Sequence, residues 1–187
     1  MTNFYTGIGS RETPISITDH MSDIAVELYH LGFWLRSGRA KRADYAFQRG
    51  AEYAAKDTRV YRQEIYLPDT SFEKQFGNIG AILPSKFDNY EDAEYLVSTI
   101  HKAGDNLRGF ARRAHTRNMY QVLGQDLNTP SRFLICYAKP EGKTRVSGGT
   151  NSAWVLAGRN NVPRYNLWYD SALQDVYSLI EDLKCKP

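Results

Sequence analysis

The chain has 187 residues, of which 42% are hydrophobic and 24% are charged, and its formal net charge is +3. A chain of this size can bury a sizeable core, so we expect one domain over residues 1–187 and exclude a disordered protein. It contains no apolar run of the ~20 residues that a membrane helix needs, no segment typical of a secretion signal, and only two, widely separated cysteines. These features predict a cytoplasmic protein with no membrane association, no disulfide framework and no metal site.

Five short runs that are typical of β-strands alternate with helical patterns along the chain. The runs are 4–9, 32–37, 64–68, 132–138 and 162–167. Between them, apolar residues recur at the spacing of one helix face over 17–31, 43–54, 93–103 and 173–183. The alternation predicts an α/β fold: a Rossmann-like, doubly wound parallel sheet with strand order 3-2-1-4-5 and helices on both faces. Residues 69–90 fit neither period and are expected to form an irregular excursion, which is often functional.

Ligands of such a sheet bind outside the carboxyl ends of the strands, where the strand order reverses. The loop after the first predicted strand offers four candidate residues there: Gly7, Gly9, Ser10 and Arg11. Glycines at this point allow a tight turn and let a ligand approach the backbone closely. The third glycine of the dinucleotide fingerprint is replaced by Glu12, so a standard NAD site is not expected.

The loop after the second predicted strand adds positive charge to the same crevice. Its candidate residues are Ser37, Gly38, Arg39, Arg42 and Asp44. Asp44 either pairs with the neighbouring basic residues or receives a ribose hydroxyl. Further along the chain, Arg113 and Arg117 are four residues apart and so share a helix face, and Asn118 follows them.

The strongest single signal is a Gly-Gly turn directly before a helical pattern. Its candidate residues are Ser147, Gly148, Gly149, Thr150 and Asn151. Successive backbone N–H groups in such a turn, at the start of a helix, form a binding site for an anion. An ordinary capped helix is the alternative, because Ser, Thr and Asn are also preferred N-cap residues.

Charge is unevenly distributed along the sequence. Residues 36–62 carry eight Lys or Arg against three Asp or Glu, and residues 102–117 carry five against one. Residues 64–96 reverse the balance, with seven acidic residues against two basic ones. This segregation suggests a positive face on the folded protein, although solvated helix faces would give the same pattern.

Several of these segments resemble the Rossmann domain of the DNA-processing protein A family. The stretch "SGRAKRADYAFQRGA" is similar to the family motif "SGxAxGxDxxAHxGA", and it matches at Ser37, Gly38, Ala40, Asp44, Ala46, Gly50 and Ala51. The stretch "TRNMYQVLG" resembles "RNRxIAGL" through Arg117 and Asn118. The stretch "SGGTNSA" resembles "SGSLxTA" through Ser147, Gly148 and Ala153. The order of the motifs implies the SLOG superfamily, which also contains the Lonely Guy phosphoribohydrolases and nucleotide sensors of bacterial immunity.

The departures from these motifs concern both catalysis and charge. The glutamate of the Lonely Guy motif "PGGxGTxxE" is replaced by Val155, and its third glycine by Asn151. The second glycine of "SGxAxG" is Arg42. Small stand-alone members of the superfamily occur in bacteriophages, and the start "YTGIGSRETP" is similar to theirs.

Together, the residues and the resemblance predict a nucleotide-binding protein without a catalytic residue or a cofactor. The expected partner is a phosphorylated nucleotide-derived small molecule, such as an ADP-ribose-like or cyclic nucleotide signal. The resemblance implies a use for a phage protein, the sequestration of such a signal in the host cytoplasm. Single-stranded DNA binding in recombination is the alternative, and nucleotide phosphoribohydrolase activity is the second alternative. A homo-oligomer is compatible with the sequence.

Overall fold

The structure is a computed structural model that describes residues 3–185. Its strands are β1 (Asn3–Gly9), β2 (Phe33–Ser37), β3 (Gln63–Tyr66), β4 (Ala81–Ile82), β5 (Leu134–Tyr137), β6 (Pro140–Glu141), β7 (Arg145–Val146) and β8 (Arg164–Asn166). Its helices are α1 (Ile15–His30), α2 (Ala43–Ala55), α3 (Tyr90–Ile100), α4 (Gly109–Leu123), α5 (Thr150–Arg159) and α6 (Asp170–Lys184). None of the helices within residues 3–185 is long and apolar enough to cross a membrane.

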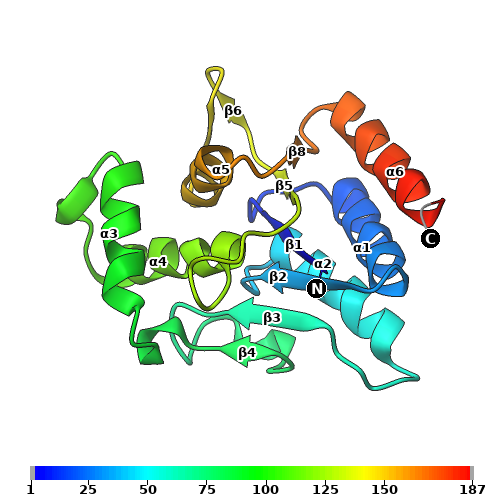
Figure 1. The fold of residues 1–187 in the computed structure, drawn as a ribbon, viewed down its shortest axis with the longest axis horizontal. Coiled ribbons are helices and arrows are strands. Elements are labelled where there is room, and N and C mark those ends of the chain that lie inside the picture. Colours follow the sequence, from blue (N-terminus) through cyan, green and yellow to red (C-terminus); the bar gives the residue numbers. More distant parts are fainter. Residues whose placement is uncertain (1–2, 186–187) are drawn as a thin grey trace.

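The main sheet has six parallel strands in the order β4-β3-β2-β1-β5-β8. The five predicted strands correspond to β1, β2, β3, β5 and β8, so the predicted order 3-2-1-4-5 is confirmed. The sequence did not predict β4, a two-residue strand inside the excursion that extends the sheet beside β3. It also did not predict the short antiparallel hairpin of β6 and β7, which projects from the sheet after β5 (Figure 1).

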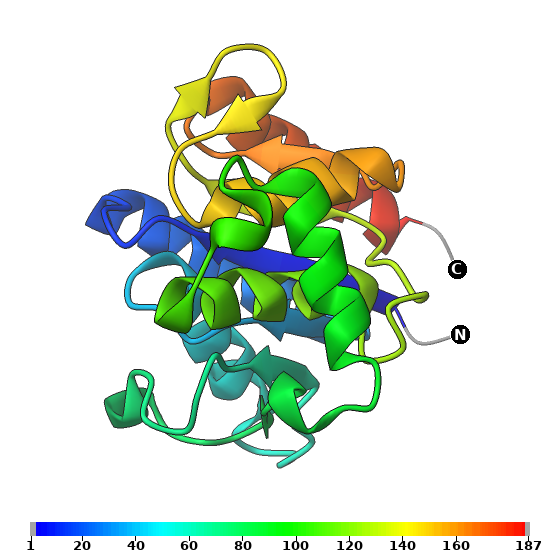
Figure 2. The same cartoon turned by 90° about the vertical axis from the view of Figure 1, so that its left-hand side faces the viewer.

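Each face of the sheet buries its own apolar core beneath helices, as the predicted α/β class requires. On one face, the apolar sides of α1, α2 and α6 cover residues that include Tyr5, Leu35 and Ile135. On the other, α3, α4 and α5 cover residues that include Ile8, Leu134 and Cys136. Figure 2 looks onto the second face, where α3 and α4 lie in front of the strands. Successive residues of a strand, such as Leu134 and Ile135, belong to opposite faces, as expected for side chains in a β-sheet.

Close packing explains three of the predicted glycines, two of them against α2 and one against Arg117 of α4. A Cβ on Gly7 would lie 2.6 Å from the ring of Phe47, and one on Gly9 would lie 2.7 Å from the Cβ of Ala43. A Cβ on Gly38 would lie 1.2 Å from Nη1 of Arg117. Gly7 and Gly38 are therefore needed for contact between protein elements. Neither of the two lines the cavity described below.

The excursion at 69–90 is held against the sheet by Arg39. Arg39 is fully buried, and its Nη1 donates hydrogen bonds to the carbonyl oxygen of Gly77 (2.5 Å) and to Oδ1 of Asn78 (2.9 Å). Its Nη2 donates to the carbonyl oxygen of Phe72. The guanidinium, which the sequence placed at the ligand crevice, instead fixes a segment that has little regular structure of its own.

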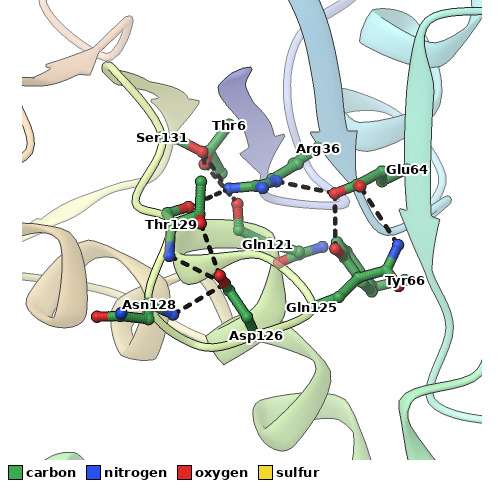
Figure 3. A network of polar contacts seen from close by, with 10 residues as sticks. All are labelled: Thr6, Arg36, Glu64, Tyr66, Gln121, Gln125, Asp126, Asn128, Thr129 and Ser131. Carbon is green, nitrogen blue, oxygen red and sulfur yellow. Dashed lines mark hydrogen bonds and ion pairs between the residues drawn. The ribbon is translucent and has the colours of Figure 1, made fainter. Parts of the chain in front are cut away.

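A buried polar network joins the strands to the loop between α4 and β5 (Figure 3). Nε of Arg36 donates to Oε2 of Glu64 at 2.9 Å, and its Nη1 donates to the carbonyl oxygen of Thr129 at 2.6 Å. The Tyr66 hydroxyl donates to the same Glu64 oxygen at 2.7 Å. The Arg36 guanidinium also lies over the ring of Phe4, 3.7 Å from its centroid. The network therefore ties β2, β3 and the segment that leads into β5 to one buried cation.

Candidate functional site

A cavity of about 380 Å³ opens at the carboxyl end of β1. Its position is the switch point of the sheet, because the chain runs from β1 to β2 on one side while β5 lies on the other. Its walls come from the loop after β1, the start of α2, the inner face of α4 and the turn before α5. The excursion contributes Phe72. Segments far apart in the sequence thus meet where a Rossmann-like fold binds ligands.

The structure brings ten of the seventeen sequence-derived candidates to this cavity. They are Gly9, Ser10, Arg11, Asp44, Arg117, Asn118, Ser147, Gly148, Gly149 and Thr150. The other seven do not line it: Gly7, Ser37, Gly38, Arg39, Arg42, Arg113 and Asn151. Two of these have clear structural tasks, since the Ser37 hydroxyl donates to the carbonyl oxygen of Gly7 (2.6 Å) and Nη2 of Arg113 pairs with Asp69 (3.2 Å).

Asp44 and Arg117 form a buried ion pair in the cavity wall. Oδ2 of Asp44 lies 3.7 Å from Nη1 of Arg117, and Oδ1 accepts a hydrogen bond from the backbone N–H of Gly9 at 3.0 Å. Burial raises the pKa of Asp44 to about 6, against the opposing influence of Arg117 and the backbone donors. Burial also lowers the pKa of Arg117. Asp44 thus pairs with Arg117 of α4, and not with the basic residues beside it in the sequence that were the expected partners.

Two donor atoms of residues that line the cavity are fully buried and have no protein acceptor among the described residues. They are Nε of Arg117 and Nε2 of Gln121, on side chains that are 8% and 1% exposed. Nη1 of Arg117 donates to the carbonyl oxygen of Tyr66 at 3.1 Å, which fixes the guanidinium in place. Buried donors without acceptors are costly, and they are frequent where a ligand supplies the missing partner.

The turn at 147–150 forms the opposite wall. Gly148 has a φ of +69°, a left-handed conformation that favours glycine, and α5 begins at Thr150. Within residues 3–185, the backbone N–H groups of Gly148, Gly149 and Thr150 donate to no protein acceptor. These three groups lie at the first turn of a ten-residue helix, where the sequence predicts a turn that binds an anion.

A polar cluster between α4 and α5 holds this turn in position. Nδ2 of Asn118 donates to the carbonyl oxygen of Gly149 (2.8 Å) and to the Ser152 hydroxyl (3.0 Å). Nδ1 of His115 also contacts that hydroxyl, at 2.9 Å. Burial, with His101 and Arg117 nearby, lowers the pKa of His115 to about 4. His115 is therefore neutral at physiological pH.

Two aromatic residues that the sequence analysis did not consider also line the cavity. The rings of Phe72 and Phe110 lie 5.8 Å apart with an interplanar angle of 34°, and Phe110 is 48% exposed. Phe72 comes from the excursion and Phe110 from the first turn of α4. The sequence signal that could have identified Phe110 was an aromatic residue in a basic, otherwise polar stretch, as in "RGF".

The backbone of Arg42 carries strain. Its φ of +73° and ψ of −106° belong to a region that favours glycine, the residue that the resembled motif has at this position. Such a conformation costs a non-glycine residue roughly 1–3 kcal/mol. The side chain is exposed and does not line the cavity.

We therefore expect Arg42→Gly to raise the free energy of unfolding by about 1 kcal/mol, once the greater chain entropy of glycine is subtracted. Urea unfolding at neutral pH measures this change. Arg42→Ala is the matched control, because it removes the same charge but keeps a Cβ, and it should give no gain. If both variants gain the same stability, the lost charge is the cause, and the backbone explanation is contradicted.

No family model and no curated protein matches the chain. Among solved structures, the chain is similar to DNA processing protein A from Helicobacter pylori, with a TM-score of 0.44 and 16% sequence identity. The match covers 97% of this chain and 81% of that chain. That structure was described for its single-stranded DNA binding mode. The fold class stated above rests on the sheet topology and not on this likeness.

Proposed function

We propose that the cavity binds a phosphorylated, nucleotide-derived ligand and does not cleave it. The observation that carries the proposal is the free N–H row of Gly148, Gly149 and Thr150 in the wall of a cavity that also contains Arg117. Backbone N–H groups at a helix start together with a guanidinium are the donors that phosphate oxygens prefer. The ligand's phosphate would occupy the turn.

The remainder of the cavity suits the other parts of a nucleotide. Phe72 and Phe110 offer an aromatic surface on which a base can stack, a contact worth about 1–3 kcal/mol in proteins that bind single-stranded nucleic acids. The amide of Gln121, which has a free donor, lies in the same wall. Asp44 acts through Arg117 in this proposal, because its carboxylate holds the guanidinium at the cavity.

Two titratable groups in the cavity wall, Asp44 and His115, are engaged in a way that favours binding over catalysis. Asp44 is 2% exposed, and its oxygens are engaged by Gly9 and Arg117. His115 contacts Ser152, but Ser152 is 1% exposed and does not line the cavity, so this pair offers no accessible nucleophile. A protein that holds a nucleotide signal and releases it intact lowers the free concentration of that signal. Sequestration of a host signal is the use that the resemblance to phage-encoded members suggests.

Gly149→Val tests the proposal without changing charge. A Cβ at Gly149 meets no atom within 4 Å, so the variant should fold normally while its side chain fills the space at the turn. We expect an unchanged melting temperature and about a ten- to hundredfold loss of affinity, the range for losing charge-assisted hydrogen bonds. Calorimetry with nucleoside monophosphates, ADP-ribose isomers and cyclic dinucleotides measures the affinity, and chromatography shows whether the ligand is recovered intact.

Gly149→Ala is the graded control and should lose less affinity than the valine variant. Steady turnover of any ligand would contradict binding without cleavage. If Gly149→Val binds its ligand as tightly as the wild-type protein does, the turn is not part of the binding site. If the protein binds no member of the panel, the proposal is overturned.

A further inference from the structure

A second cavity, of about 360 Å³, lies on the other side of the Gly148–Gly149 turn. It shares His115, Gly148 and Gly149 with the first cavity. Its remaining wall includes His101, Lys102 and Arg145. The two cavities therefore meet at this turn, which contributes residues to the walls of both.

The two histidines of the second cavity lie against each other, with ring centroids 4.5 Å apart. Nδ1 of His101 accepts a hydrogen bond from the backbone N–H of Ala103 at 3.1 Å. A neutral imidazole has one protonated nitrogen, so the proton of His101 is on Nε2. This N–H is a donor for a ligand.

Arg145 and Lys102 supply positive charge to the same space. Nη2 of Arg145 donates to the carbonyl oxygen of Ile100 at 3.2 Å, which holds the side chain across the end of α3. Its buried Nε has no acceptor within residues 3–185. Lys102 is exposed, and the carboxylate that lines the cavity is that of Glu141 on β6. The cavity wall therefore contains two positively charged side chains and a histidine donor, against one negatively charged side chain.

We propose that the second cavity binds a second phosphate of the same ligand, so that the ligand class is a nucleotide with phosphates on both sides of one nucleoside. The inference rests on the proposed function, because the first phosphate occupies the Gly148–Gly149 turn. His101, Lys102 and Arg145 contact the second phosphate. Asn151, whose Oδ1 accepts the N–H of Val146 at 3.2 Å, shapes the turn between them.

The surrounding charges favour a small ligand over a long strand of nucleic acid. Arg112 pairs with Glu94 at 2.7 Å, and Arg113 pairs with Asp69 at 3.2 Å. These arginines extend along α4 from the cavity, but the protein's own carboxylates already neutralise them. Contacts to phosphate are therefore concentrated at the two cavities, whereas a nucleic-acid groove must contact many phosphates.

The test compares nucleoside 5′-monophosphates with the corresponding 3′,5′-bisphosphates, for all four common bases, by calorimetry. We expect a bisphosphate to bind wild-type protein at least tenfold more tightly than its monophosphate. Lys102→Ala should remove most of this difference. Glu141→Gln should tighten bisphosphate binding by about threefold, because it removes a like charge. Lys143→Ala, at the exposed tip of the hairpin and in the wall of neither cavity, is the matched control.

The outcomes separate the two proposals. Equal affinity for mono- and bisphosphates would overturn the second subsite and leave the proposed function intact. Failure of every mono- and bisphosphate to bind would overturn the second subsite, and failure of the ADP-ribose isomers and cyclic dinucleotides as well would overturn the proposed function. Oligonucleotides whose affinity rises with each added phosphate, with a salt slope steeper than about −3, would overturn the small ligand in favour of single-stranded DNA.

Discussion

Replacing Arg117 with methionine is expected to weaken nucleotide binding by about ten- to a hundredfold. The Arg117 side chain lines the first cavity, and it is 8% exposed in a wall that contains a free Nε donor. The side chain is largely desolvated before the ligand arrives, so a phosphate gains a charge-assisted contact at little additional cost to the protein. Methionine keeps much of the length of the side chain and removes the charge and the donors.

The same substitution leaves Asp44 without its cation. The pKa of Asp44 is already raised to about 6, and Arg117 opposes that rise, so the variant's carboxyl group will take up a proton at a still higher pH. We expect some loss of stability at neutral pH for this reason. The double variant Arg117→Met/Asp44→Asn removes the isolated carboxylate and should bind nucleotide as weakly as the single variant. Its affinity therefore separates the lost phosphate contact from a disturbed fold.

Arg59→Met is the matched control for charge. Arg59 is exposed in the loop after α2 and lines neither cavity. The variant should bind nucleotide within about twofold of wild type, because an exposed charge at a distance is largely screened by salt. A loss equal to that of Arg117→Met would mean that the protein binds anions over a diffuse basic surface.

The sheet could be predicted because its signal is periodic. Apolar residues at helical spacing and short β-rich runs fixed five strands and their order, since right-handed crossovers leave few alternatives. The strands that sequence reasoning missed, β4, β6 and β7, have two residues each. Two residues cannot display a period of two, so their pairing is decided by tertiary contacts.

The cavity could be predicted in part, where backbone position decides the outcome. Gly9 and the Gly148–Gly149 turn follow from glycines at the ends of elements. Arg39 differs, because its φ of +61° and its hydrogen bonds turn the side chain toward the excursion. The direction of a long side chain depends on partners that only the folded chain brings near.

Aromatic side chains show the same limit of sequence reasoning. Tyr45 stacks on Phe76 with ring centroids 3.9 Å apart, and Tyr120 stacks on Tyr66 at 5.8 Å, so these rings serve internal packing. Phe72, which does line the cavity, lies in an excursion without a period. Loop position alone therefore did not identify the rings that reach the cavity.

The uneven charge of the sequence also has an internal explanation. The acidic segment 64–96 supplies partners to both basic segments: Glu64 to Arg36, Asp69 to Arg113, and Glu94 to Arg112. A positive face predicted from segment charges is thus reduced by pairing within the fold. The basic groups that remain at the cavities are few, which is why a ligand with few phosphates suits them better than a long strand.

The largest expected effect on stability comes from Arg36. Replacing this buried arginine, which is 2% exposed, with methionine should lower the free energy of unfolding by about 3–5 kcal/mol, as is typical when one partner of a buried ion pair is removed. The carbonyl oxygen of Thr129 would lose its donor, and Glu64 would keep only the Tyr66 and Gln125 contacts. Urea unfolding monitored by circular dichroism measures the change.

A double variant and a control decide whether the buried pair is the cause. Arg36→Met/Glu64→Leu removes both charges, so it should recover a substantial part of the loss, since the damage in the single variant comes from leaving a carboxylate buried without its cation. Arg49→Met removes the same type of side chain from the pair with Asp19, whose members are 49% and 64% exposed, and should cost less than about 1 kcal/mol. If the losses from Arg36→Met and Glu64→Leu simply add in the double variant, the two residues are not energetically coupled. The network that joins β2, β3 and the approach to β5 would then stabilise the fold through its packing rather than through its charges.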